Sequence, residues 1–73
     1  MPGSVYKVIE LVGTSSESWE DAAKTAVVTA GQSLRDLRIA EIIKLDMQLD
    51  DNGEVSLFRA KVSVSFKHEA GGD

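Results

Sequence analysis

The sequence predicts an α+β fold, a single domain with the element order strand, helix, strand, strand. A run of strand-forming residues comes first, and an amphipathic helical pattern follows it. Two long alternating segments come last, joined by Asn52-Gly53, the strongest short hairpin signal. We assign residues 1–73 to one domain, with residues 70–73 as a loose C-terminal tail.

The first strand passes into the helix with almost no connector. It contains strand-forming residues that are apolar on both pleat faces, namely Val5, Tyr6, Val8, Ile9, Leu11 and Val12. Gly13 breaks this run. Thr14 and Glu17 then fit a capping box, in which a hydroxyl caps an orphan N–H and a carboxylate reaches back. We expect a helix over about residues 16–34, with an apolar stripe made of Trp19, Ala22, Ala23, Ala26, Val27 and Ala30.

The last two strands are expected over residues 37–49 and 54–68, with a two-residue type I′ turn at Asn52-Gly53. On one face this turn pairs apolar residues, namely Met47 with Phe58, Ile43 with Val62 and Ile39 with Phe66. On the other face it pairs Asp46 with Arg59 and Lys44 with Lys61. Pattern and turn agree on this register, which puts Ile39 and Arg59 on opposite faces.

The lengths of these elements predict self-assembly. Strands of about 13 residues reach ~43 Å at ~3.3 Å per residue. A helix of about 17 residues covers only ~25 Å at 1.5 Å per residue. The chain has no cysteine, so no disulfide supports a small core. We therefore expect neighbouring copies of the chain to bury the uncovered sheet.

The overall charge restricts the partners. The net charge of −4 and the isoelectric point of about 4.8 argue against nucleic acid and against anionic membranes. No apolar run approaches the ~20 residues that span a bilayer. No charged-then-apolar signal region opens the sequence, so we expect a cytoplasmic protein.

Three segments carry a family resemblance: VYKVIELVGTSSESWEDAA at the start, LRDLRIAEI in the middle and VSVSF at the end. The chain resembles the dodecins over nearly its whole length. The resemblance implies a three-stranded antiparallel sheet partly wrapped around one helix. It also implies a hollow spherical homododecamer that binds small ligands, mostly flavins such as FMN and riboflavin.

The resemblance also identifies candidate ligand positions. Flavin-binding dodecins stack flavins on a tryptophan two residues before the glutamate of the middle motif. The matching residues here are Ile39 and Glu41. A glutamine that hydrogen-bonds the flavin matches Arg59. Ile39 offers no flat π-face, and Arg59 can donate but not accept, so we expect stacked flavin binding to be weak or absent. Alternatively, Ile39 packs on Phe66 and Arg59 pairs with Asp46.

Acidic residues near the hairpin are candidate cation ligands, because calcium prefers carboxylate oxygens. Asp46 and Asp50 are the leading pair. They lie ~13 Å apart at strand rise, so only a symmetry axis of an oligomer can bring such carboxylates to one ion. The Asp46-Met47 stretch is similar to a branch of the family that lacks the tryptophan and is linked to calcium. The alternative is a solvated acidic turn.

The remaining polar residues do not indicate catalysis. Glu41 falls on the mostly apolar face, so it is expected to have a partner or a wet pocket. His68 is the only histidine and is expected at the surface. No set of general acid, base and nucleophile can be assembled from the sequence. We expect a protein that is not an enzyme, and a shell without a specific ligand remains a further alternative.

Overall fold

A computed structural model describes residues 3–67 and confirms the α+β fold. Strand β1 spans Tyr6–Ser15, helix α1 spans Trp19–Gly31, β2 spans Leu37–Leu49 and β3 spans Val55–Lys67. The three strands form one antiparallel sheet in the order β1-β3-β2. The predicted tail and His68 lie outside the described residues. Within residues 3–67, no helix is long and apolar enough to cross a membrane.

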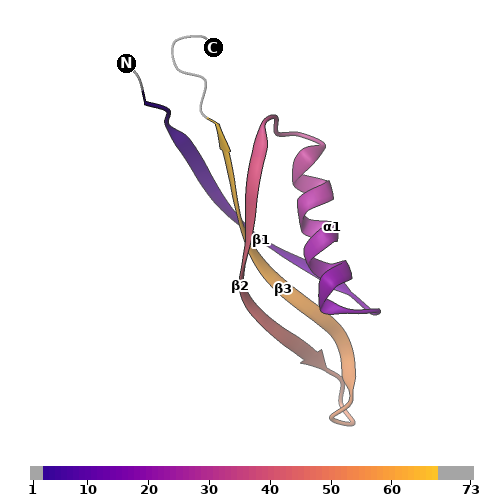
Figure 1. The fold of residues 1–73 in the computed structure, drawn as a ribbon. Coiled ribbons are helices and arrows are strands. Elements are labelled where there is room, and N and C mark those ends of the chain that lie inside the picture. Colours follow the sequence, from indigo (N-terminus) through magenta and orange to yellow (C-terminus); the bar gives the residue numbers. More distant parts are fainter. Residues whose placement is uncertain (1–2, 68–73) are drawn as a thin grey trace.

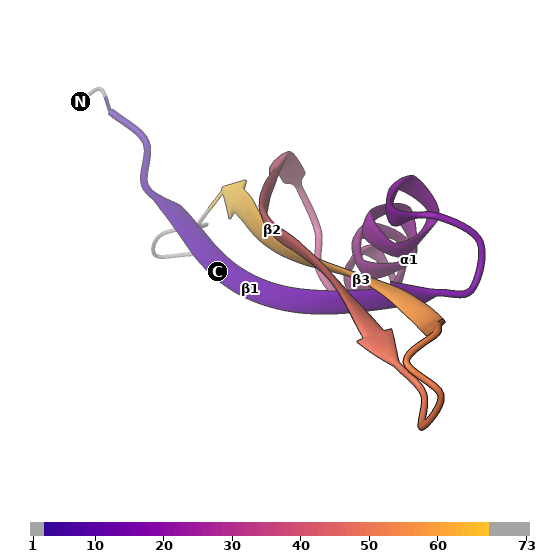
Figure 2. The same ribbon diagram turned by 90° about the horizontal axis from the view of Figure 1, so that it is seen from below.

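Helix α1 packs on one face of the sheet, and the strands extend well past it (Figures 1 and 2). Alanines on the helix and alternate residues of β3 form the small buried core, which consists of Ala22, Ala26, Ala60, Val62 and Val64. The opposite face of the sheet has no covering element among the described residues. We call it the helix-distal face.

The junction between β1 and α1 differs from the prediction. Gly13 does not end the strand, because β1 continues to Ser15. A Cβ atom at Gly13 would clash with the backbone oxygen of Ala22, so glycine here lets the helix pack closely on the strand. The helix cap is Ser18, whose side chain accepts a hydrogen bond from the Asp21 N–H. The predicted capping box at Thr14 was therefore wrong.

The helix is also shorter than predicted, since it begins at Trp19 and ends at Gly31. Ser15 explains the later start: its hydroxyl accepts from the Glu17 N–H at 2.8 Å and donates to the Asp21 carboxylate at 2.7 Å. These bonds satisfy polar groups of the connector before the helix begins.

The hairpin turn has three residues, not the predicted two. Asp50 and Glu54 close the loop through a backbone hydrogen bond of 2.8 Å, and Gly53 has a φ of +79°. Asn52 is not among the described residues with positive φ, so the turn is not type I′. Ser56 is an extra residue of β3 between Val55 and Leu57. This extra residue offsets the additional residue of the loop, so the predicted register returns at Gln48 and Leu57.

The register is as predicted near the turn and shifts beyond it. Met47 faces Phe58, Asp46 faces Arg59 and Lys44 faces Lys61. A β-bulge at Ile43 then puts Ile42, not Ile43, opposite Val62. Ile39 faces Ser65 instead of Phe66. The bulge moves Ile39 and Glu41 to the other face of the sheet, so the prediction that Glu41 lies on the apolar face was wrong.

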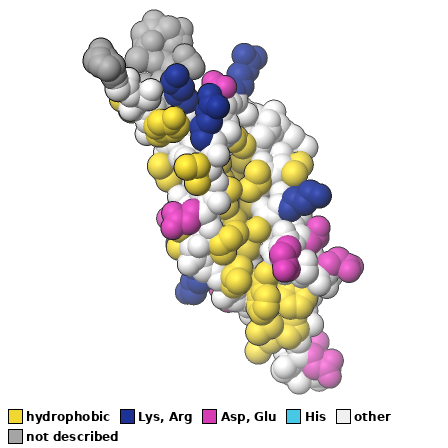
Figure 3. All heavy atoms as spheres, viewed as in Figure 1, with side chains coloured by type: hydrophobic (Ala, Val, Ile, Leu, Met, Phe, Trp, Pro, Cys, Tyr) yellow, Lys and Arg dark blue, Asp and Glu magenta, His cyan; other side chains and the backbone are white. Residues whose placement is uncertain are grey.

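A single copy leaves much apolar surface exposed. Among residues 3–67, Val62 and Val64 are the largest fully buried side chains, whereas twelve large apolar residues are exposed. Figure 3 shows apolar side chains in a broad band on the face that carries the helix. The radius of gyration is 15.2 Å, against about 11 Å for a compact domain of this length. One copy is an elongated unit that lacks a full core.

Candidate functional site

The β-bulge collects the candidate ligand residues on the helix-distal face. Val62 and Val64 of β3 point toward the helix, so the alternate residues of β3 and their cross-strand partners point away from it. The helix-distal face therefore carries most of the candidate residues, namely Ile39, Glu41 and Asp46 from β2 and Arg59 from β3, together with Lys44 and Lys61.

Ile39 and Glu41 are neighbours on this face, and both are exposed, Ile39 at 66%. Arg59 shares the face but lies opposite Asp46, whereas Ile39 lies opposite Ser65. Six residues of strand separate these two positions, which is ~20 Å. One chain therefore does not bring all three predicted ligand residues together, and a site that uses Ile39 and Arg59 must draw them from two copies.

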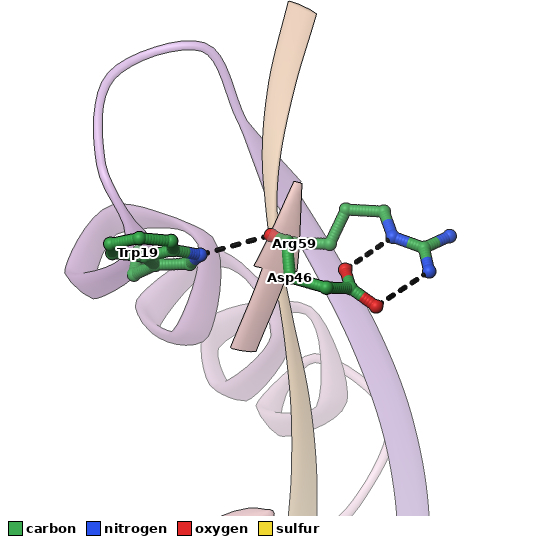
Figure 4. Close-up of polar contacts among 3 residues, drawn as sticks. All are labelled: Trp19, Asp46 and Arg59. Atoms are coloured by element: carbon green, nitrogen blue, oxygen red, sulfur yellow. Dashed lines mark hydrogen bonds and ion pairs between the residues drawn. The ribbon is translucent and has the colours of Figure 1, made fainter. Parts of the chain in front are cut away.

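Asp46 and Arg59 form a forked ion pair on the helix-distal face (Figure 4). Arg59 Nε donates to Asp46 Oδ1 at 2.7 Å, and Arg59 Nη2 donates to Oδ2 at 2.9 Å. These hydrogen bonds lower the pKa of Asp46, and the charges of Arg59 and Lys44 lower it further. The predicted pairing of Asp46 with Arg59 is confirmed, and the carboxylate is already engaged within one chain.

Trp19 contacts β2 from the side opposite to Arg59. Its indole Nε1 donates to the backbone oxygen of Asp46 at 3.0 Å, and its ring meets Phe58 edge to face at 5.2 Å. Figure 4 shows Trp19 on one side of β2 and Arg59 on the other. The sequence predicts Trp19 only as part of the apolar stripe, although its indole N–H is a donor that needs a partner when the ring is packed.

Asp50 belongs to the turn and not to a metal cluster. Its Oδ1 accepts from the Asn52 N–H at 2.9 Å and from the Glu54 N–H at 3.0 Å. Among residues 3–67, no group of three or more acidic or histidine side chains is arranged to hold a metal ion. Asp46 and Asp50 therefore do not form a cation site within one chain, in line with the expectation that only an oligomer axis could converge them.

Two hollows lie on either side of β2. The larger, about 410 Å³, is apolar and lies between the helix and the sheet, lined by Trp19, Glu20, Ala23, Ile42 and Leu45. The smaller, about 250 Å³, lies on the helix-distal face and is lined by Val12, Lys44, Asp46, Arg59 and Lys61. The larger hollow suits apolar packing, and the smaller hollow suits a charged ligand.

Comparison with known proteins decides the family. A family model described as Dodecin matches residues 5–69. The chain belongs to the dodecin family. Dodecamer assembly is known for this family, and the resemblance found in the sequence is confirmed.

Two dodecins show how closely the chain follows the family. Calcium dodecin from Mycobacterium tuberculosis is 50% identical over 64 residues, which cover 88% of this chain and 89% of that protein. The crystal structure of calcium dodecin matches with a TM-score of 0.81 at 46% identity, covering 96% of this chain and 99% of the other. The dodecin structure from Streptomyces coelicolor matches with a TM-score of 0.88 at 32% identity, covering 97% and 100%.

Proposed function

We propose that this chain forms a non-enzymatic, dodecin-type shell of identical copies that binds or stores small ligands on the helix-distal face. The observation that carries this proposal is the exposed, adjacent pair Ile39 and Glu41, which occupies the positions of the family's ligand motif. The forked Asp46–Arg59 pair adds a charged region to the same face. Two copies together supply all three candidate residues, Ile39, Glu41 and Arg59.

Stacked flavin binding by this shell is weak or absent. Aromatic stacking adds ~0.5–1.5 kcal/mol per pair beyond the burial of area, and Ile39 has no π-face to supply it. Arg59 is held by Asp46 and has no acceptor for a flavin edge. Titration of riboflavin and FMN with the protein is expected to leave most of the flavin fluorescence unquenched.

Ile39→Trp tests the flavin proposal, with Ile39→Leu as the matched control that keeps an aliphatic residue. The tryptophan variant, alone or with Arg59→Gln, is expected to gain flavin quenching, and the leucine variant is not. Strong stoichiometric quenching by the wild-type protein, or no gain from the double variant, would contradict the assignment of this site.

Calcium binding is the second candidate, favoured by the 50% identity to a protein named calcium dodecin. In this account, carboxylates from several copies of the chain meet at a symmetry axis of the oligomer and bind the ion there. Asp46 and Asp50 are the leading candidates. The ion relieves repulsion within the cluster. Because Asp46 is paired with Arg59, the ion must compete with a guanidinium for that carboxylate.

Thermal melts with calcium and with chelator test this candidate on wild type, Asp46→Asn and the turn control Asp51→Asn. Calcium is expected to raise the melting temperature of wild type and of the control, because it binds the folded state. Asp46→Asn is expected to ignore calcium, and without metal it is expected to melt slightly lower than wild type because it loses the ion pair with Arg59. If Asp46 only pairs with Arg59, the variant is slightly less stable than wild type and calcium changes the melting temperature of none of the three proteins.

A further inference from the structure

The turn between β2 and β3 holds the one asparagine of the sequence, Asn52, directly before Gly53. In such a pair the glycine peptide nitrogen can attack the asparagine side chain, because glycine has no Cβ to hinder the approach. The turn projects past helix α1 (Figure 1), and residues 50–55 are all exposed. Nothing lies within 4 Å of the position that a Cβ of Gly53 would take. The carboxamide of Asn52 is therefore open to attack and to water.

Hydrogen bonds to Asp50 restrain this attack in the folded turn. The Gly53 N–H donates to the backbone oxygen of Asp50 at 3.0 Å. The side chain of Asp50 accepts from the N–H groups of Asn52 at 2.9 Å and of Glu54 at 3.0 Å. The attack needs a free Gly53 nitrogen and rotation of the Asn52 backbone, so these bonds must open first. Asp50 therefore controls how often the turn reaches a reactive conformation.

We propose that Asn52 is a site of spontaneous deamidation and that Asp50 sets its rate. Hydroxide or water removes the proton of the Gly53 nitrogen, and this nitrogen forms a bond to Cγ of Asn52. The bond from Cγ to the side-chain nitrogen breaks, and ammonia leaves. Water then opens the cyclic imide at either of its carbonyl carbons. One product is aspartate. The other is isoaspartate, in which the main chain runs through the former side chain.

The modification adds negative charge to a turn that is already acidic. Aspartate at position 52 stands among Asp50, Asp51 and Glu54, and it makes the chain one unit more negative than its present −4. Isoaspartate also lengthens the main chain of the turn by one carbon atom. The register beside the turn depends on the loop length, because Ser56 offsets the additional loop residue. Deamidated chains are therefore expected to melt at a lower temperature than unmodified chains.

Mass spectrometry of the full chain, aged in its assembled state, tests the proposal. Trypsin cleaves after Lys44 and Arg59, so Asn52 and Gln48 are recovered in one peptide. Asn52 of the wild-type protein is expected to convert to aspartate and isoaspartate with time. Gln48 is expected to stay intact, because its longer side chain must close a larger ring. The rate of conversion is expected to rise with pH, since the attacking nitrogen must lose its proton.

Asp50→Ala tests the control by the turn, with Asp51→Ala as the matched variant that removes the neighbouring acid. Within residues 3–67 the Asp51 side chain accepts no hydrogen bond, whereas Asp50 accepts two through its side chain. Asp50→Ala is expected to deamidate about tenfold faster than wild type, a change that the loss of hydrogen bonds to a charged acceptor can produce. Asp51→Ala is expected to deamidate at close to the wild-type rate.

Wild type unfolded in guanidinium chloride keeps the test informative if Asp50→Ala does not fold. It has no turn, so Asn52 is expected to convert faster than in the folded protein. A folded protein that keeps Asn52 intact while the unfolded chain converts it overturns the proposed site. Equal rates in wild type and folded Asp50→Ala, or in folded and unfolded wild type, overturn the role of Asp50. Asn52→Gln is expected to keep its melting temperature on ageing, and a loss equal to that of wild type would assign the ageing to another residue.

Discussion

Asp46 connects the two faces of β2. Its backbone oxygen accepts a hydrogen bond from the indole N–H of Trp19 on the helix side. Its carboxylate accepts hydrogen bonds from Nε and Nη2 of Arg59 on the other side. The pairing with Arg59 was counted correctly from the hairpin, because the extra residue Ser56 restores the register that the three-residue turn shifts. The bond from Trp19 could not be predicted in this way, since it joins residues 27 positions apart through the docking of the helix.

The ion pair at Asp46 predicts a specific acid response. Arg59 lowers the pKa of Asp46, so the folded chain holds this proton less tightly than the unfolded chain. The stabilising contribution is complete above the ordinary value of 3.8 and is lost as the pH falls below it toward the lowered pKa. Chemical denaturation of wild type and Asp46→Asn at several pH values should give curves that converge under acid.

Asp51→Asn is the control for this acid response, because Asp51 lies in the exposed turn. It is expected to follow the wild-type curve. Since both partners of the Asp46–Arg59 pair are partly exposed, solvent screens the interaction and the difference at neutral pH is expected to be modest. An Asp46→Asn curve parallel to wild type down to the lowest pH would show that the ion pair adds nothing to stability.

The elements themselves were largely predictable, and their boundaries less so. Strand β2 spans 37–49 as expected, because its alternation is long and unbroken near the turn. The bulge at Ile43 was not predictable, because Ile42 and Ile43 are both apolar and either can face the core. That one residue decides which face Ile39 and Glu41 occupy. The candidate site therefore depended on the feature that alternation could not reveal.

Gly13 controls how closely α1 packs on β1. A Cβ at this position would clash with the backbone oxygen of Ala22, and backbone atoms cannot rotate away. Gly13→Ala is expected to destabilise the fold by at least ~1–3 kcal/mol, the usual cost of overpacking. Gly31→Ala is the matched control, since its Cβ would meet only Leu37 Cδ1 at 3.7 Å.

Urea denaturation of both glycine variants measures this difference. Gly31→Ala is expected to be neutral or to stabilise the helix by up to ~1 kcal/mol, because alanine has the higher helix propensity. A Gly13→Ala variant as stable as wild type would mean that the helix does not lie as close to β1 as the structure has it.

The whole molecule is an incomplete unit whose missing core comes from assembly. In the part of the chain that the structure describes, the fully buried side chains are no larger than valine, and exposed apolar residues line both faces of the sheet, including Val8, Val12, Ile42 and Leu45. A chain of this size buries only ~60% of its unfolded surface even when compact. We expect the dodecamer known for the family to give these residues partners in neighbouring copies.

Light scattering at micromolar concentration tests the assembly. The expected mass is about twelve times the 7.9 kDa of one chain. Leu45→Glu puts a charge on the exposed apolar surface between the helix and the sheet, and it is expected to reduce this mass because a buried unpaired charge opposes association. Lys24→Glu adds the same acid to the exposed side of α1 and is expected to leave the mass unchanged. A wild-type chain that stays folded as a monomer would show that the exposed apolar surface tolerates water, and the shell proposed for ligand binding would then have no basis.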